Sequence, residues 1–139
     1  MDKPTIKGNT IEIPSDTKYL SDVDSFVEGL LRGFGADESV IADIAISVSE
    51  LVNNAISHGN KTAPDEPVTV TCEQVNGTAQ IIVSDHGGGF DPQAVANPIS
   101  EENLMKDVGR GIFIVKALMD AVDIKPSEAG TSVTIRKAI

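Results

Sequence analysis

The stretch ELVNNAISHG, residues 50–59, decides how this sequence is interpreted, because it places an acid, an amide and an imidazole at intervals of four. Residues four apart lie on one face of an α-helix, so Glu50, Asn54 and His58 would form a single polar ridge. The simplest explanation of such a ridge is the solvated face of an amphipathic helix. The alternative is chemical: the carboxylate could act on a hydroxyl group, the amide oxygen could bind Mg²⁺, and His58 could close the helix end.

A second block, DHGGGF at residues 85–90, follows the apolar run of residues 81–83 and places an aspartate where a buried strand would leave a sheet. A carboxylate in that position can accept a hydrogen bond from an exocyclic amine such as that of adenine. Gly87 and Gly89 would let the backbone approach a flat base closely. An ordinary turn explains the same residues equally well, because aspartate and glycine are both common in turns.

A third block, GRGIFIV at residues 109–115, places two glycines at the start of an expected helix. Free N–H groups at a helix N-terminus bind phosphate, and Arg110 adds a cation that could reach the same group. A single Gly-x-Gly pair is weak evidence, and the sequence contains neither a Walker phosphate-binding loop nor a dinucleotide-binding fingerprint. Taken together, the three blocks predict a nucleotide pocket with a cation site and a candidate general base.

Size and composition limit the classes of protein to consider. The 139 residues suit one domain spanning residues 1–139, and 40% of them are hydrophobic. No apolar run approaches the roughly 20 residues of a membrane helix, and the N-terminus lacks the apolar core of a secretory signal, so we expect a cytoplasmic protein without membrane contact. A net charge of −10 argues against direct nucleic-acid binding, and one cysteine with two histidines argues against a zinc site.

Apolar periodicity and turn residues predict an α/β protein of the α+β two-layer type. The order of elements is typical of a mixed β-sheet with helices on one face. Asn76-Gly77 predicts a hairpin turn, and most of residues 85–108 are expected to form a mobile loop. The expected elements are strands at 10–13, 68–73, 78–83, 122–125 and 131–136, and helices at about 16–33, 37–59 and 112–119.

In this order and spacing, the three blocks resemble the nucleotide-binding boxes of the GHKL ATPases, a superfamily that includes gyrase, sensor histidine kinases and MutL. Gly130-Thr131 resembles the Gly-Thr element that precedes the last strand of these proteins. The resemblance runs from Ile11 to Lys137 and implies a fold of the Bergerat type. The stretch GRGIFIVKALMDAV, residues 109–122, is most similar to the anti-sigma-factor serine kinases, which are small stand-alone members.

The resemblance implies a role for each matching residue. It makes Glu50 the catalytic acid/base and Asn54 the ligand of Mg²⁺, while Asp85 binds the adenine amine. Thr131 lies near the adenine side, and residues 91–108 form a lid over the phosphates. The further residues that it assigns to binding of the cofactor ATP are His58, Gly87, Gly89, Phe90, Gly109, Arg110, Gly111 and Ile112.

The implied function is an ATP- and Mg²⁺-dependent serine/threonine kinase that phosphorylates an anti-anti-sigma protein and sequesters a sigma factor. These two proteins are the expected partners, and a homodimer is left open. One alternative is a non-catalytic module in which bound ATP only sets a conformation for partner switching. Another is the detached ATPase domain of a histidine kinase, although the helix expected at 16–33 contains no histidine that could accept a phosphoryl group.

Overall fold

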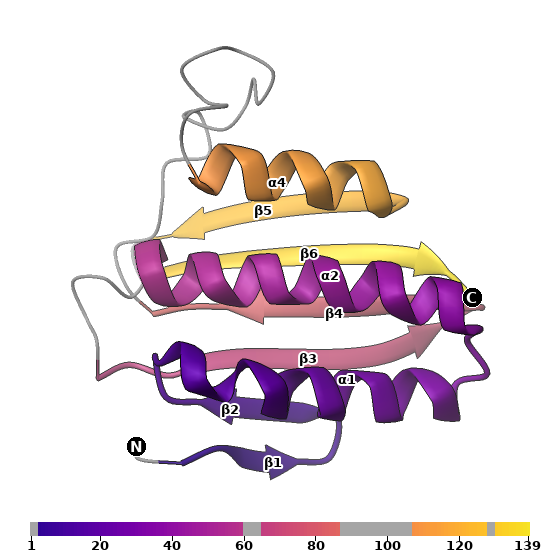
Figure 1. Cartoon of the computed structure of the whole chain (residues 1–139), viewed down its shortest axis with the longest axis horizontal. Coiled ribbons are helices and arrows are strands. Elements are labelled where there is room, and N and C mark those ends of the chain that lie inside the picture. The colour runs from indigo at the N-terminus through magenta and orange to yellow at the C-terminus, as the bar shows by residue number, and fades with distance from the viewer. Residues whose placement is uncertain (1–2, 60–64, 87–106, 128–129) are drawn as a thin grey trace.

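The protein folds into two layers, in which a six-stranded sheet is covered on one face by helices α1, α2 and α4 (Figure 1). The computed structural model describes residues 3–59, 65–86, 107–127 and 130–139. The strand order is β1-β2-β3-β4-β6-β5. The strands are β1 (Thr5–Lys7), β2 (Thr10–Ile13), β3 (Val68–Val75), β4 (Thr78–Ser84), β5 (Ala121–Ser127) and β6 (Gly130–Ala138).

The predicted two-layer architecture is confirmed, and the sheet is simpler than expected in one respect. Each pairing within the described sheet is antiparallel, so it does not mix parallel and antiparallel neighbours. β1 was not predicted, since it is a short, exposed edge strand without an apolar alternation. The predicted hairpin between β3 and β4 is present, and Asn76 and Gly77 adopt φ values of 50° and 75°, as a tight turn between twisted strands requires.

Two helical segments, η1 and α2, begin where the sequence supplies a side-chain cap. A 3₁₀ turn, η1 (Thr17–Tyr19), leads into α1 (Leu20–Gly33), and the Asp16 side chain accepts from the backbone N of Lys18 at 3.0 Å. The Asp37 carboxylate caps α2 (Glu38–Asn54) by accepting from the Val40 N–H at 3.0 Å, and this bond lowers the pKa of Asp37. α2 continues as a π-helical turn, η2 (Ala55–Gly59), and α4 spans Asp107–Leu118.

The core lies between the helices and the sheet, and α2 occupies its centre. By length and composition alone, the segment Glu38–Ser57 could cross a membrane. The sequence analysis did not predict this, because polar residues interrupt the apolar ones in this segment. Its apolar residues pack on the sheet, so the composition is that of a core helix, and length and composition are weak evidence for a membrane span. The buried apolar residues of α2 are Ile41, Ile44, Val48, Leu51 and Val52.

α1 contacts α2 through a polar pair at the edge of this core. The Ser49 hydroxyl on α2 donates to Asp24 Oδ1 on α1 at 3.1 Å. Partial burial raises the pKa of Asp24, the hydrogen bond from Ser49 opposes this change, and the nearby charge of Glu28 adds to it. The charged form of Asp24 is therefore slightly unfavourable in the folded protein.

We expect Asp24→Asn to be as stable as the parent protein at pH 7 or slightly more stable. Any gain in stability should be less than about 1 kcal/mol, because the carboxyl is largely screened by solvent. The folded protein binds the Asp24 proton more tightly than the unfolded chain does. The stability from this proton is fully present below the unfolded pKa of about 3.9 and is lost as the pH rises through the raised folded value. Urea denaturation at pH 3 and pH 7 measures the difference, with the exposed Asp22→Asn as the matched control. A variant clearly less stable than the control at pH 7 would contradict this expectation.

Candidate functional site

The elements that carry the three sequence blocks meet at one end of the fold. The C-terminal end of α2, the end of β4, the beginning of β6 and the beginning of α4 all lie at the left-hand end of Figure 1. The turn η2, which continues α2, contacts β6. Segments from residues 50–59, 85–86, 109–111 and 130–131 are therefore brought to the same end of the molecule, as the nucleotide-pocket interpretation requires.

Gly111 brings the first turns of α4 against the polar ridge of α2. A Cβ atom at this position would lie 2.9 Å from Glu50 Oε2 and 3.2 Å from Asn54 Nδ2. Both distances are shorter than ordinary van der Waals contact, so a methyl group would displace the two side chains. The absence of a side chain at Gly111 therefore allows the helix backbone to approach a carboxylate and an amide together.

Asn54 is almost completely buried, with an exposed fraction of 3%, and its Nδ2 atom has no hydrogen-bond partner among the described residues. A buried polar atom without a partner typically costs 1–3 kcal/mol. The oxygen and nitrogen of an asparagine amide exchange places on a half rotation, so the side chain can present either an acceptor or a donor. No described residue supplies a partner for this amide nitrogen, so it is open to a ligand.

The oxygen atoms near Asn54 are suited to bind Mg²⁺ only together with a bound ligand. Among the described residues, no three His, Cys, Asp or Glu side chains are grouped so that they could hold a metal ion. Mg²⁺ does not need such a group, because it commonly takes one or two protein oxygens and completes its shell with phosphates and water. The amide of Asn54 beside the carboxylate of Glu50 fits that pattern.

Asp85 and Thr131 form a two-way contact at the end of the β4–β6 ladder. The Asp85 N–H donates to the Thr131 carbonyl at 3.0 Å, and the Thr131 N–H donates to Asp85 Oδ1 at 3.2 Å. The exposed fractions are 6% for Asp85 and 3% for Thr131, and Thr131 Oγ1 has no partner in the described part of the chain. The contact fixes the direction of the carboxylate and leaves a buried hydroxyl beside it.

Gly130 is required for this contact, for two reasons. Its φ of 135° lies in a region that side chains other than glycine rarely adopt. A Cβ atom there would also overlap the carbonyl oxygen of Asp85 and lie 2.9 Å from the Cα of His86. The sequence analysis gave Gly130 no role of its own, and the only signal was its position directly before Thr131.

The glycine pair of the third block lies inside α4 rather than ahead of it. The helix begins at Asp107, so Gly109 and Gly111 occupy its first two turns. The first four N–H groups of a helix have no partner within the helix, so this segment presents backbone donors at the site end of the fold. The side chain of Ile112 is fully buried in the core, which leaves only its backbone for a ligand.

Several predicted residues lie wholly or partly outside the described residues. Gly87, Gly89 and Phe90 lie outside them, as does the predicted lid up to residue 106, whereas residues 107 and 108 belong to α4. The backbones of His58 and Arg110 are placed in η2 and α4, but their side chains are not described. Their roles stay predictions.

A cavity of about 190 Å³ borders Asp85 and Thr131 at the end of the β4–β6 ladder. Its lining includes Ser84 and Ser132, which pair across the ladder and alternate with the buried, helix-facing residues. The cavity is also smaller than the 300–1,000 Å³ of typical ligand pockets. Its lining among the described residues includes Asp85 and Thr131 but neither Asn54 nor Gly111.

We expect Gly130→Ala to destabilise the protein by about 1–3 kcal/mol or more, because it combines a strained φ with an overlap against backbone atoms that cannot rotate away. Gly29→Ala is the matched control, since that exposed α1 position has no atom near the added methyl and gains up to about 1 kcal/mol from helix propensity. Thermal unfolding followed by circular dichroism measures both changes. Equal stability of the two variants would show that the Asp85 carbonyl does not restrict this position.

Comparison with known proteins agrees with this geometry. Residues 13–137 match the family model described as the histidine kinase-like ATPase domain. The serine-protein kinase RsbW of Staphylococcus epidermidis is 27% identical over 136 residues, which cover 93% of this chain and 85% of that protein. RsbW of Staphylococcus aureus strain MRSA252 is 28% identical with the same coverage.

Two solved structures share the fold. The RsbU and RsbW domains of a Mycobacterium tuberculosis protein align with a TM-score of 0.68 at 23% identity, over 94% of this chain and 32% of that longer chain. The histidine kinase domain of the blue-light activated kinase EL346 from Erythrobacter litoralis aligns with a TM-score of 0.60 at 20% identity, over 96% of this chain and 65% of that chain. The family model spans nearly the whole sequence, and this chain therefore belongs to the histidine kinase-like ATPase domain family.

Proposed function

We propose that this chain is an ATP- and Mg²⁺-dependent serine/threonine kinase that phosphorylates an anti-anti-sigma protein and also sequesters a sigma factor. The proposal treats residues 1–139 as one ATP-binding domain that acts in the cytoplasm. Its main support comes from two buried polar atoms, Asn54 Nδ2 and Thr131 Oγ1, which have no partner among the described residues and belong to elements that meet at one end of the fold. The relatives named serine-protein kinase RsbW support the class of reaction.

Recognition of adenine is assigned to the Asp85–Thr131 pair. A carboxylate accepts hydrogen bonds only, which matches the exocyclic amine of adenine. The Thr131 hydroxyl can donate or accept, so it can pair with a ring nitrogen or with a water bound beside the base. The backbone bond from Thr131 to Asp85 Oδ1 holds the carboxylate in place before the base arrives, which lowers the entropic cost of binding.

Binding of the phosphates is assigned to the first turns of α4. Unpaired N–H groups and the positive end of the helix dipole both favour an anion there. Asn54 and the phosphates together would hold Mg²⁺, which when bound neutralises negative charge on the transferring group. Because Gly111 lies against Glu50 and Asn54, phosphates at the beginning of α4 would be close to both side chains.

Glu50 is assigned to the acceptor hydroxyl. In the proposed transfer, a serine or threonine oxygen of the substrate protein forms a bond to the γ-phosphorus while the bond from that phosphorus to the β,γ-bridging oxygen breaks. Glu50 orients the hydroxyl and accepts its proton. Most of the rate enhancement then comes from positioning and from charge stabilisation.

The partners are proposed from the relatives rather than from a surface of this chain. An anti-anti-sigma protein would supply the acceptor hydroxyl, and a sigma factor would be the protein that the chain sequesters. The test is a pull-down from native extract with and without ATP, followed by transfer of a radiolabelled γ-phosphate to the captured proteins. Capture of a sigma factor without any labelled protein would favour the non-catalytic alternative.

If Asp85 reads the adenine amine, the protein should bind ATP and ADP but bind GTP more weakly by about 1–3 kcal/mol or more. Guanine presents a carbonyl oxygen at the equivalent position, and two facing acceptors would be left unpaired. Asp85→Asn should reduce this discrimination, because an amide can rotate to donate to that oxygen. Isothermal titration calorimetry with both nucleotides measures the affinities, and equal affinities in the parent protein would remove Asp85 from base recognition.

We expect Glu50→Gln to bind ATP as the parent does but to transfer phosphate about 10²–10⁴-fold more slowly, since general acid/base help has this magnitude. Glu28→Gln on α1 is the matched control and should keep the parent rate. Single-turnover transfer to the captured substrate protein gives the rates.

Gly111→Ala tests the same geometry from the other helix. Its methyl group would displace Glu50 and Asn54, so transfer should slow on the order of 10²-fold, as small misplacements can do. The helix itself should lose no stability, because alanine favours a helix over glycine by about 1 kcal/mol. Parent transfer rates in both Glu50→Gln and Gly111→Ala would place Glu50 on a merely solvated face.

A further inference from the structure

Lys137 occupies a position in β6 where an apolar residue is expected. Side chains alternate along a strand, so Lys137 lies on the same helix-facing side as Val133 and Ile135, which are buried. The Lys137 side chain is itself only 18% exposed. An ammonium group in such a place needs partners, because burial of an unpaired charge is costly.

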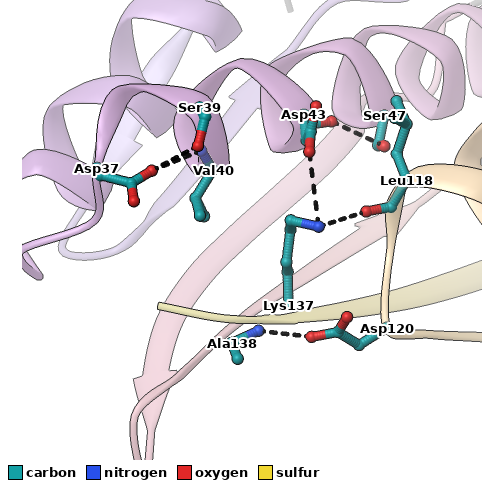
Figure 2. A network of polar contacts seen from close by, with 9 residues as sticks. All are labelled: Asp37, Ser39, Val40, Asp43, Ser47, Leu118, Asp120, Lys137 and Ala138. Carbon is teal, nitrogen blue, oxygen red and sulfur yellow. Dashed lines mark hydrogen bonds and ion pairs between the residues drawn. The ribbon is translucent and has the colours of Figure 1, made fainter.

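The partners of Lys137 come from two helices (Figure 2). Its Nζ donates to the carbonyl oxygen of Leu118, the last residue of α4, at 2.7 Å. The same atom lies 3.6 Å from Asp43 Oδ2 on α2. The last carbonyls of a helix have no partner within it and carry the negative end of its dipole, so a lysine is well suited to hold them. One ammonium group therefore joins β6, α4 and α2.

A second contact holds the same end of α4. In the turn that follows the helix, Asp120 Oδ2 accepts from the Ala138 N–H at 2.7 Å, as Figure 2 shows, and the Asp120 N–H donates to the Arg136 carbonyl at 2.9 Å. Leu118 is thus bonded to Lys137, and Asp120 is bonded to the two residues of β6 on either side of Lys137. The C-terminal end of α4 is fixed to the sheet and, through Lys137, to α2.

The Lys137 bridge and the approach at Gly111 are two of the places where α2 and α4 are joined, and they are equally spaced on both helices. The helices run in opposite directions in Figure 1, so α4 begins where α2 ends. On α2, seven residues separate Asp43 from Glu50, and on α4 the same number separates Leu118 from Gly111. At 1.5 Å per residue each interval is about 10 Å. The Lys137 contact and the Gly111 contact therefore lie two helical turns apart on each helix. Together they fix the position of α4 along the axis of α2.

We propose that Lys137 is a positioning residue that sets the register of α4 on α2 and so keeps Gly111 against Glu50 and Asn54. Its effect on phosphate binding rests on the proposed function, whereas its effect on the two helices does not. Loss of the ammonium group should leave base recognition by Asp85 and Thr131 intact, because those residues belong to β6 and to the segment after β4 rather than to α4.

The test compares four variants of the full chain. Lys137→Met removes the charge and keeps the length of the side chain, and Lys137→Arg keeps the charge. Asp43→Asn removes only the ion pair, so it reports on the contact even where Lys137→Met does not fold. Lys125→Met is the matched control, because that lysine on β5 is exposed and pairs only locally, with Asp123 at 3.5 Å.

In the ligand-free protein, Lys137→Met should accelerate amide hydrogen exchange in α4 by about 10- to 100-fold, which is the range for loss of a hydrogen bond to a charged group. The nuclear magnetic resonance signals of the Gly111 amide and of the Asn54 side-chain amide should shift. Asp43→Asn should give smaller changes of the same kind, Lys137→Arg should largely restore the parent behaviour, and Lys125→Met should change neither. Unchanged exchange and unchanged signals in both Lys137→Met and Asp43→Asn would overturn the proposal.

Lys137→Met should weaken the binding of ATP roughly tenfold or more and leave the affinity for adenosine unchanged, because only the phosphate end of the binding site depends on α4. If Lys137 had a purely structural role, its loss would weaken the binding of both ligands equally or of neither. That result would also overturn the proposal. If the parent protein binds neither ligand, the proposed function fails, and the ligand-free exchange and resonance measurements still decide the role of Lys137.

Discussion

The close approach of α4 to α2 at Gly111 is the constraint on which the proposed site depends. A single missing methyl group lets a helix backbone reach a carboxylate and a buried amide at once. A side chain at this position would have to displace the ends of the Glu50 and Asn54 side chains. Packing in the core maintains this close approach, since Ile112 and Val115 of α4 are fully buried beside the apolar face of α2.

The site leaves polar atoms unpaired where the rest of the described core does not. Within the described residues, Asn54 Nδ2 and Thr131 Oγ1 are the two buried side-chain atoms that lack a hydrogen-bond partner. Proteins rarely leave such atoms buried, because each typically costs 1–3 kcal/mol. Asn54 belongs to the first of the three sequence blocks, and Thr131 belongs to the Gly-Thr element that the family resemblance singled out. A ligand that satisfies them would recover this free energy on binding.

The two ends of the helix pair have different tasks in this arrangement. At the site end, Gly111 permits contact by having no side chain. At the far end, Lys137 creates contact by supplying an ammonium group to Leu118 and Asp43. The Lys137 contact, about 10 Å from Gly111 along the helix, adds a directional restraint to the apolar packing of Ile112 and Val115. Such a fixed register suits chemistry that depends on positioning more than on covalent steps.

Much of the fold could be predicted from the sequence because its signals are local. The Asn76-Gly77 turn and the apolar periodicity of α2 each depend on a few neighbouring residues, and the structure confirms both. The candidate residues Glu50 and Asn54 were also identifiable, since a spacing of four places them on one helix face. The local pattern could not tell whether that face was solvated or functional, because this depends on what packs against it.

The tertiary structure alone decided the contacts between distant segments. Gly111 against Glu50, Gly130 beneath the Asp85 carbonyl, and Lys137 between two helices all join residues far apart in the chain. The all-antiparallel pairing of the sheet was equally out of reach, because strand direction follows from how the connections cross the molecule rather than from any strand's own sequence. The amino-acid sequence determined the elements and the chemistry that each carries, and the packing of α4 on α2 decided which of those groups meet.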